Sequence, residues 1–175
     1  MADSLIFYTN PMSRGQIVRW MLEEVGAPYE QVLLDYGTTM KAPEYLAINP
    51  MGKVPAIKHG DHVVTECAAI CAYLAEAFPQ AGLAPTAEER ADYYRWLFFA
   101  AGPLEQAIIN TALGFVVPDD RQLMAGYGNL EAATNAIAGA VSAHDYVAGD
   151  RFTAADVYIG SQISWGLEFN TLPRL

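Results

Sequence analysis

The chain has 175 residues, of which 53% are hydrophobic and 17% are charged, and its formal net charge is −10. Such a chain is globular and long enough to bury one sizeable core or two smaller ones. Its 20 acidic residues against 10 basic ones disfavour a nucleic-acid partner, because phosphate backbones are bound by clustered Lys and Arg.

Two further features bear on the compartment. The N-terminal segment MADSLIFY has no basic region, and no apolar run approaches the length of about twenty residues that spans a membrane. Cys67 and Cys71 lie four residues apart in a helical pattern, which is a poor arrangement for a disulfide bond and favours a reducing environment. We therefore expect a cytoplasmic protein with no membrane partner.

The first half of the chain predicts an α/β unit. SLIFYT has strand composition, and the apolar residues between Val18 and Val25 recur at helical spacing before Gly26 ends the helix. YEQVLL reads as a second strand, and a looser stretch leads to VPAIKHGDHVVT, a hairpin that turns between His59 and His62. ECAAICAYLAEAF is again helical. The expected order is β-α-β, a loop, and then β-β-α.

The second half predicts helices alone. PQAGLAPTAEE carries two prolines and a glycine, which marks a break between elements. Helical patterns follow at 88–115, where Pro103 predicts a kink, at 119–147, where glycines interrupt it, and at 153–169, which opens on a capping-box pair, Thr153 and Asp156. The expected organisation is an α/β domain at 1–79, a linker at 80–87 and an all-helical domain at 88–175.

The Val54-Pro55 pair in NPMGKVPAI poses a problem for the strand that follows, because proline cannot donate a ladder hydrogen bond. One solution is a cis peptide bond, in a turn that exposes the Val54 backbone to an extended, peptide-like ligand. The alternative is an edge strand with a trans proline.

The TECAAI segment places the start of a helix at Glu66 and Cys67. The free N–H groups and the positive dipole end of such a terminus can bind a carboxylate, and Glu66 can hold an ammonium group beside it. An amino acid's carboxylate and amine would fit that pair. The alternative is that Glu66 only complements the helix dipole.

Ser13 lies where the first strand has ended and a long amphipathic helix begins. A serine at this position can be a helix cap, or it can be a hydroxyl placed for chemistry. The local sequence does not separate these two roles.

Taken together, the strand-to-helix serine, NPMGKVPAI, TECAAI and YVAGDRFTAADVYIG occur in the order seen in cytosolic glutathione transferases, from Leu5 to about Trp165. The chain resembles the serine-type members of that family, such as the plant phi class and bacterial relatives. The resemblance implies a thioredoxin-like α/β domain, an all-α helical domain and a homodimer. It also implies glutathione as co-substrate and detoxification of a hydrophobic electrophile.

The resemblance also assigns roles to residues. It makes Ser13 the hydroxyl that hydrogen-bonds the glutathione sulfur, with Asn10 or backbone groups alone as alternatives. The glutathione-binding set is Lys41 and Lys53 at the glycyl end, Val54 before Pro55 at the cysteinyl backbone, Glu66 at the γ-glutamyl ammonium, and Cys67 at the γ-glutamyl carboxylate. Two residues depart from the family: Cys67 replaces the usual serine, and Met40 replaces a histidine common in phi-like members.

The remaining expectations concern the second substrate and the function. The second-substrate pocket would be lined by Met12, Phe99, Gly102 and Glu105, although the phenylalanine can equally be helical core. We expect no metal site, and we expect His59 and His62 to be solvent-exposed beside their turn.

The resemblance implies a helical segment after ISWGLEF, whereas the sequence stops at NTLPRL. Either that helix is naturally absent from the helical domain, or the sequence omits it. The expected activity is glutathione conjugation, with peroxide reduction, dehalogenation or isomerisation as related activities. The alternative is a non-catalytic binding or scaffold protein that keeps the fold. A dithiol oxidoreductase is disfavoured because the chain has no C-x-x-C.

Overall fold

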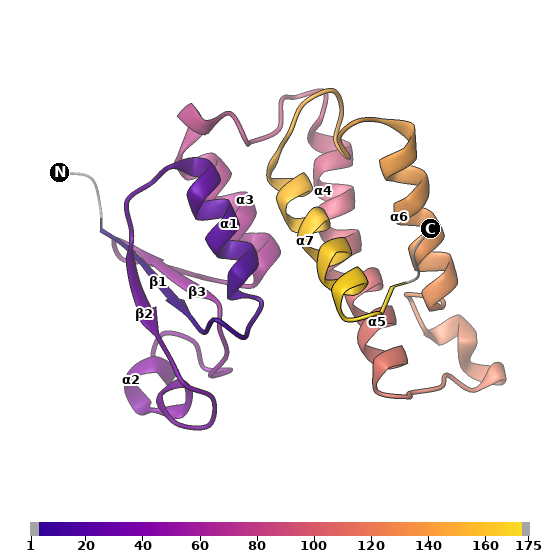
Figure 1. Cartoon of the computed structure of the whole chain (residues 1–175), viewed down its shortest axis with the longest axis horizontal. Coiled ribbons are helices and arrows are strands. Elements are labelled where there is room, and N and C mark those ends of the chain that lie inside the picture. The colour runs from indigo at the N-terminus through magenta and orange to yellow at the C-terminus, as the bar shows by residue number, and fades with distance from the viewer. Residues whose placement is uncertain (1–3, 173–175) are drawn as a thin grey trace. The chain divides into compact units, whose positions relative to one another are not determined.

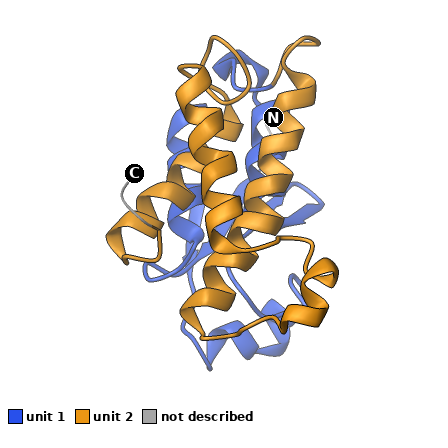
Figure 2. Ribbon diagram, turned by 90° about the vertical axis from the view of Figure 1, so that its right-hand side faces the viewer, with its two compact units in different colours: residues 1–84 blue, residues 85–175 orange. Residues whose placement is uncertain are grey.

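A computed structural model describes residues 4–172 and divides the chain into two units, Met1–Ala84 and Pro85–Leu175 (Figures 1 and 2). We call them unit 1 and unit 2. Their border lies inside the segment 80–87, where the sequence places a linker. Within residues 4–172, none of the helices combines the length and the apolar character that crossing a bilayer requires.

Unit 1 is a thioredoxin-like α/β unit built on a four-stranded mixed sheet of order β2-β1-β3-β4. β1 pairs parallel with β2 and antiparallel with β3, which in turn pairs antiparallel with β4. The strands are β1 (Leu5–Thr9), β2 (Glu30–Leu33), β3 (Ala56–His59) and β4 (His62–Thr65). The predicted order of strands and long helices is confirmed, but the stretch expected to be a loop contains a 3₁₀ helix, Thr39–Lys41, and a short α-helix.

Two helices of unit 1, α1 (Gly15–Val25) and α3 (Cys67–Ala77), pack side by side (Figure 1). The apolar face predicted between Val18 and Val25 is buried, and α1 ends at Gly26 in the left-handed region. A short helix, α2 (Pro43–Leu46), precedes β3 and contributes Tyr45 to a second apolar cluster. The apolar face of α1 therefore packs in one part of the unit 1 core, and residues 40–48 contribute to a separate apolar cluster.

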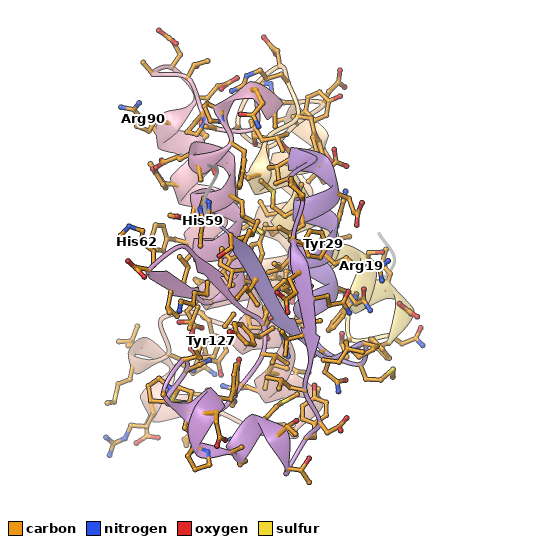
Figure 3. The ribbon with its side chains drawn as sticks, turned by 90° about the vertical axis from the view of Figure 1, so that its left-hand side faces the viewer. Arg19, Tyr29, His59, His62, Arg90 and Tyr127 are labelled. Carbon is orange, nitrogen blue, oxygen red and sulfur yellow. The ribbon has the colours of Figure 1, made fainter. Side chains whose placement is uncertain are left out.

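The β3–β4 hairpin turns at Gly60 and Asp61, because His59 pairs with His62 (Figure 3). His62 is exposed, but His59 is only partly exposed. The His59 ring stacks on Phe78 with centroids 5.5 Å apart, and its Nδ1 lies 3.0 Å from the Tyr73 hydroxyl. The expectation of solvent exposure is therefore wrong for His59, because side chains from the end of α3 cover its ring.

Unit 2 is helical, and within residues 85–172 its extended structure is limited to an isolated bridge between Tyr146 and Gly149. Its helices are α4 (Arg90–Phe99), α5 (Glu105–Ala112), α6 (Leu130–Ala143) and α7 (Ala154–Glu168). Pro103 lies in a π-helical turn, Ala100–Leu104, that joins α4 to α5. A π-helical turn changes the local pattern of backbone hydrogen bonds and so accommodates a proline, which has no N–H to donate.

The prediction of one interrupted helix over 119–147 is wrong in extent. Asp119–Met124 is a 3₁₀ segment, and the α-helix begins only after Asn129, whose side chain accepts a 2.8 Å hydrogen bond from the Ala132 amide. The two glycines before this cap favour a turn over a helix. The capping box at the start of α7 is confirmed, with Thr153 and Asp156 bonded reciprocally.

Candidate functional site

Three loops of unit 1 meet at one end of its sheet. The register pairs Tyr8 with Ala56 and Ala56 with Thr65. The residues that follow β1, precede β3 and follow β4 therefore lie at the same end. These loops, residues 10–14, 51–55 and 66–67, carry most of the residues that the sequence analysis selected.

The loop before β3 presents Val54. The Val54–Pro55 peptide bond is cis, which is the first of the two alternatives drawn from the sequence. The Val54 side chain packs against the cluster of Met40, Tyr45 and their neighbours. Among the described residues, the hydrogen bonds that hold this loop leave out the Val54 amide and carbonyl. That backbone edge is thus free to pair with an extended ligand.

Ser13 lies just before α1 and is 6% exposed. Its hydroxyl donates to the Asn10 carbonyl at 2.6 Å and accepts from the Gly15 amide at 3.0 Å. The hydroxyl therefore closes a local turn just before α1, whose N-cap residue is Arg14. A Cβ at Gly15 would clash with Thr9 Oγ1 at the end of β1, so the close approach of the start of α1 to β1 favours glycine at this position.

The Asn10 side chain ties the first loop to the neighbouring strand. Its Nδ2 donates to the Leu34 carbonyl at 2.8 Å, and its Oδ1 accepts from the Met12 amide at 2.9 Å. An amide nitrogen has two donors, so one N–H of Asn10 remains for another acceptor. The side chain of Met12 is 82% exposed at the tip of this loop.

Glu66 and Cys67 begin α3 beside the start of α1. Glu66 has φ 68° and ψ 120°, and its side chain makes no capping bond to its own helix. A non-glycine residue at positive φ is uncommon and marks functional sites more often than other positions. The Cys67 thiol donates to the Arg14 carbonyl at 3.6 Å, so the N-termini of the two helices lie close together and both are favourable to an anion.

Neither cysteine takes part in a disulfide bond, and the two differ in burial. Cys67 is half-buried, whereas Cys71 is fully buried in α3. Burial, and to a smaller extent the nearby Cys67, raises the pKa of the Cys71 thiol well above its ordinary value. Cys71 therefore stays a neutral packing residue.

The two lysines of the predicted site have different settings. The Lys41 ammonium donates to the Gly52 carbonyl at 2.9 Å and to the Met51 carbonyl at 3.1 Å. Its third N–H remains for an anion. Lys53 is exposed in the same loop. Met40, which replaces the histidine of phi-like members, is 2% exposed and belongs to the core cluster.

Two residues near this end were not found by sequence reasoning. The Tyr45 hydroxyl and the Asn49 amide both donate to the Lys53 carbonyl, at 2.6 and 2.8 Å. Asn49 lies in the NPMGKVPAI motif, but nothing in the motif shows which carbonyl its side chain binds. Tyr45 gave no signal, because an apolar position in a short helix is ordinary core.

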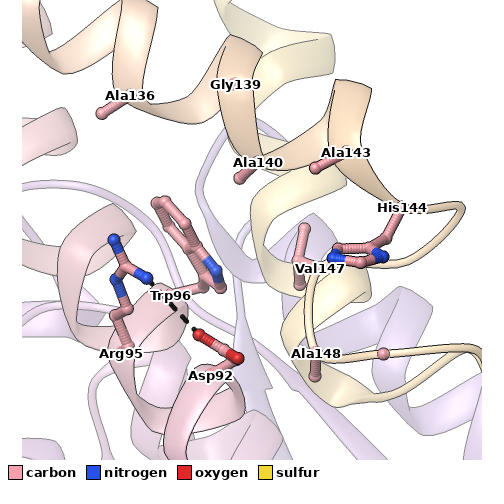
Figure 4. A pocket seen from close by; sticks show the side chains of 11 residues that line it. Asp92, Arg95, Trp96, Ala136, Gly139, Ala140, Ala143, His144, Val147 and Ala148 are labelled. Carbon is pink, nitrogen blue, oxygen red and sulfur yellow. Dashed lines mark hydrogen bonds and ion pairs between the residues drawn. The ribbon is translucent and has the colours of Figure 1, made fainter.

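Unit 2 contains cavities. One of about 380 Å³ lies between α4, α6 and the 144–149 loop, where the Arg95 guanidinium stands 4.5 Å from the centroid of the Trp96 ring and small residues of α6 form the wall (Figure 4). A second, of about 400 Å³, is lined mainly by apolar side chains of α6 and α7. Neither is lined by Phe99, Gly102 or Glu105. Among the described residues, no group of three or more His, Cys, Asp or Glu side chains could hold a metal ion.

Comparison with known proteins gives a consistent result. A family model described as the N-terminal domain of glutathione S-transferase matches residues 3–76. Glutathione S-transferase GST-4.5 of Xanthomonas campestris is 30% identical over 159 residues, which cover 85% of this chain and 74% of that protein. Glutathione S-transferase 3 of Zea mays is 32% identical over 164 residues, covering 87% and 73%.

Two solved structures are similar to this chain over nearly all of its length. The glutathione transferase URE2P6 of Phanerochaete chrysosporium, in complex with oxidized glutathione, superposes with a TM-score of 0.79 at 26% identity, covering 98% of this chain and 82% of that one. A glutathione transferase homolog from Sulfitobacter with bound glutathione gives a TM-score of 0.71 at 28% identity, covering 97% and 85%.

Proposed function

This chain belongs to the glutathione S-transferase family, and we propose that it binds glutathione at the three-loop end of unit 1 and activates the thiol with the Ser13 hydroxyl. It is a glutathione transferase. The observation that carries the proposal is the Cys67–Arg14 contact of 3.6 Å. That contact places two helix N-termini together, at the end of the sheet where Val54 has a free backbone edge.

The three parts of glutathione match three parts of this end. The γ-glutamyl carboxylate meets the N-terminus of α3 at Cys67, and its ammonium meets the exposed Glu66. The cysteinyl backbone pairs with Val54 in the manner of an added strand. The glycyl carboxylate approaches Lys53 and the remaining N–H of Lys41.

The sulfur comes to the start of α1, where Ser13 has to change its partner. The hydroxyl turns its proton from the Asn10 carbonyl to the sulfur, while its oxygen keeps the bond from the Gly15 amide. A free thiol with a pKa of about 8.5 is roughly 3% thiolate at pH 7. Lowering that pKa by about two units takes roughly 2.7 kcal/mol, and one hydroxyl bond to an anion with a helix N-terminus supplies about that amount.

The reaction then needs no group beyond these. The thiol proton passes to solvent, and the thiolate donates its electron pair to an electrophilic carbon. A carbon–sulfur bond forms as a leaving group departs with its own electron pair, or as an activated double bond accepts the charge. Holding both reactants in one place supplies the remaining advantage. Ser13 is not the nucleophile.

We further propose a hydrophobic electrophile as the second substrate. Peroxide reduction, dehalogenation and isomerisation are related activities that use the same thiolate. We also propose that the protein works as a homodimer in the cytoplasm, in detoxification.

The test is Ser13→Ala, with Ser164→Ala on the exposed face of α7 as the matched control. We would measure glutathione affinity by calorimetry, the pKa of the bound thiol by its ultraviolet absorbance, and turnover with a panel of electrophiles and hydroperoxides. Losing the hydroxyl bond should raise the thiol pKa by about one to two units and lower turnover about ten- to a hundredfold near neutral pH. Affinity should change little.

The outcomes separate the alternatives. If Ser13→Ala turns over as fast as the wild type, Ser13 does not activate the sulfur, and Asn10→Ala is the next variant. If the wild type does not bind glutathione, the catalytic proposal is wrong and the scaffold alternative stands. Because Ser13→Ala also loses two local hydrogen bonds, its melting temperature has to be recorded beside the kinetics.

A further inference from the structure

Three consecutive carbonyls, those of Met51, Gly52 and Lys53, are held by side chains from one short segment. Lys41 Nζ binds the first two, at 3.1 and 2.9 Å. Tyr45 Oη and Asn49 Nδ2 converge on the third, at 2.6 and 2.8 Å. We call Lys41, Tyr45 and Asn49 the carbonyl brace.

We propose that Tyr45 and Asn49 are positioning residues for glutathione, which act by aiming the Val54 amide at the ligand through the Lys53 carbonyl. This inference rests on the proposed function. Neither side chain contacts glutathione directly. Both act on the Lys53–Val54 peptide unit, whose amide contacts the ligand.

The mechanism follows from the planarity of the peptide unit. The Lys53 carbonyl and the Val54 N–H belong to the same trans peptide plane and point in opposite directions. Two donors on the carbonyl therefore fix the direction of the N–H as well. Ordering this group before binding removes an entropy cost that glutathione would otherwise bear.

The position of Tyr45 suits it to this task. Its side chain is 4% exposed and packs in the cluster that also holds Met40 and the Val54 side chain. Its ring lies 5.5 Å from that of Tyr8, centroid to centroid. Burial raises the pKa of Tyr45 to about 12, so the hydroxyl remains a donor at any working pH.

Asn49 is the second fixed donor. It is 5% exposed, and its Oδ1 accepts a hydrogen bond from the Met51 amide at 3.1 Å while its Nδ2 donates to the Lys53 carbonyl. One side chain thus binds both ends of the loop that precedes Val54. The amide cannot shift to follow a moving carbonyl without losing its other bond.

Gly52 shows how closely the loop is drawn against the brace. It has φ 56°, and a Cβ there would lie 2.7 Å from the Met40 carbonyl oxygen and 2.8 Å from Lys41 Nζ. Any side chain would push the loop away from Lys41. The glycine of NPMG is therefore needed for the approach as well as for the turn.

The experiment compares Tyr45→Phe with Tyr29→Phe, a matched control that loses a tyrosine hydroxyl bond to Glu23 in the same unit. The probes are glutathione and its analogue in which a methyl group replaces the thiol. Tyr45→Phe should lower the affinity for both ligands equally, by about three- to tenfold, as expected for one lost hydrogen bond. The pKa of the bound thiol and kcat at saturation should not change, and Tyr29→Phe should bind as the wild type does.

A second variant tests the shared carbonyl. When one donor is removed, the other still partly holds the Lys53 carbonyl. Tyr45→Phe combined with Asn49→Ala should therefore lower affinity by more than the product of the two single losses. Equal binding of both ligands by wild type, Tyr45→Phe and the double variant would overturn the inference. So would a loss confined to the thiol-bearing ligand, because that would place the effect at the sulfur.

The readouts keep this inference apart from the function on which it rests. A purely structural role would lower the melting temperature and leave affinity below the transition unchanged, and that result also overturns it. If the wild type binds neither ligand, the glutathione site itself is wrong and the brace falls with it. If the wild type binds glutathione and the Tyr45 and Asn49 variants bind it equally well, the glutathione site is correct but the carbonyl brace does not position it.

Discussion

The two units hold their loops with different acceptors. In unit 1 the site loops are tied by neutral or cationic donors to main-chain carbonyls, as when Asn10 binds the Leu34 carbonyl or Lys41 binds that of Gly52. In unit 2 the corresponding links converge on two carboxylates. Glu89 accepts from the Thr86 amide and the Arg151 guanidinium, and Asp156 accepts from Thr153 and Val147.

This difference separates what each unit contributes. A carbonyl that is held fixes its own peptide plane, so the links of unit 1 set the backbone geometry on which ligand binding depends. A carboxylate accepts several hydrogen bonds at once, so one side chain in unit 2 holds donors from more than one segment. Substitutions that remove these carbonyl links of unit 1 should therefore change glutathione affinity, whereas substitutions at these carboxylates of unit 2 should change stability.

Among the substitutions in unit 2, Asp156→Ala should have the largest effect on the free energy of unfolding. Asp156 accepts from the Thr153 amide at 2.8 Å, from its hydroxyl at 2.9 Å and from the Val147 amide at 2.8 Å. Thr153 is fully buried, so its donors would lose their partner without gaining water. We expect a loss of about 3 kcal/mol in the free energy of unfolding, measured with urea.

The matched control is Asp150→Ala, an exposed aspartate in the preceding loop, which should cost less than about 0.5 kcal/mol. Hydrogen exchange should report the lost protection in unit 2. If Asp156→Ala lowered glutathione affinity as much as stability, the division of labour between the units would be wrong.

Arg151→Met should have the next largest effect. Arg151 Nε and Nη2 meet the two oxygens of Glu89 at 2.9 and 2.6 Å, joining the start of α4 to the segment before α7. We expect a loss of about 1–2 kcal/mol in the free energy of unfolding. Arg121→Met is the control, because its pair with Asp120 is exposed on both sides and should contribute little.

The same pair gives a pH dependence with a definite sign. The Arg151 hydrogen bond, followed by that of the Thr86 amide, lowers the pKa of Glu89 below its ordinary value of 4.5 against the opposing effect of burial. A carboxyl with a lowered folded-state pKa stabilises the fold fully above its unfolded pKa, and this contribution is lost as pH falls through the folded one. The stability gap between wild type and Arg151→Met should therefore shrink below about pH 4.5, and a gap that widened in acid would contradict the assignment.

The sequence predicted the fold well where one local pattern dominates. The apolar spacing from Val18 to Val25 gave α1, and the Thr153–Asp156 spacing gave the start of α7, because each pattern is read within one helix. It failed at His59 and at residues 119–129. The first depends on Phe78, far along the chain, and the second on glycines that shift the balance between α-helix and turn.

For the candidate site, the motifs selected the three loops but not what holds them. Val54 and Glu66 were found because Val-Pro and a strand-to-helix junction are visible in sequence. The bonds from Tyr45 and Asn49 to the Lys53 carbonyl join side chains to backbone across four to eight residues. Bonds of this kind have no periodicity, so only a structure reveals them.

Cys67→Ser is the mildest variant and tests the comparison from the unit 1 side. It replaces a weak S–H donor with a stronger O–H donor to the Arg14 carbonyl and leaves the backbone N–H of residue 67 unchanged. Because unit 1 binds its ligand through backbone geometry, glutathione affinity should hold or improve, by less than about threefold.

Calorimetry with glutathione checks this, and Cys71→Ser, which buries a hydroxyl where the thiol is fully enclosed, is the contrasting variant. That change should lower stability rather than change the contacts to the ligand, because a buried hydroxyl needs a partner of its own. A large loss of affinity in Cys67→Ser alone would mean that the thiol itself takes part in binding. The α3 terminus would then act through its side chain and not, as the carbonyl-linked loops do, through its backbone.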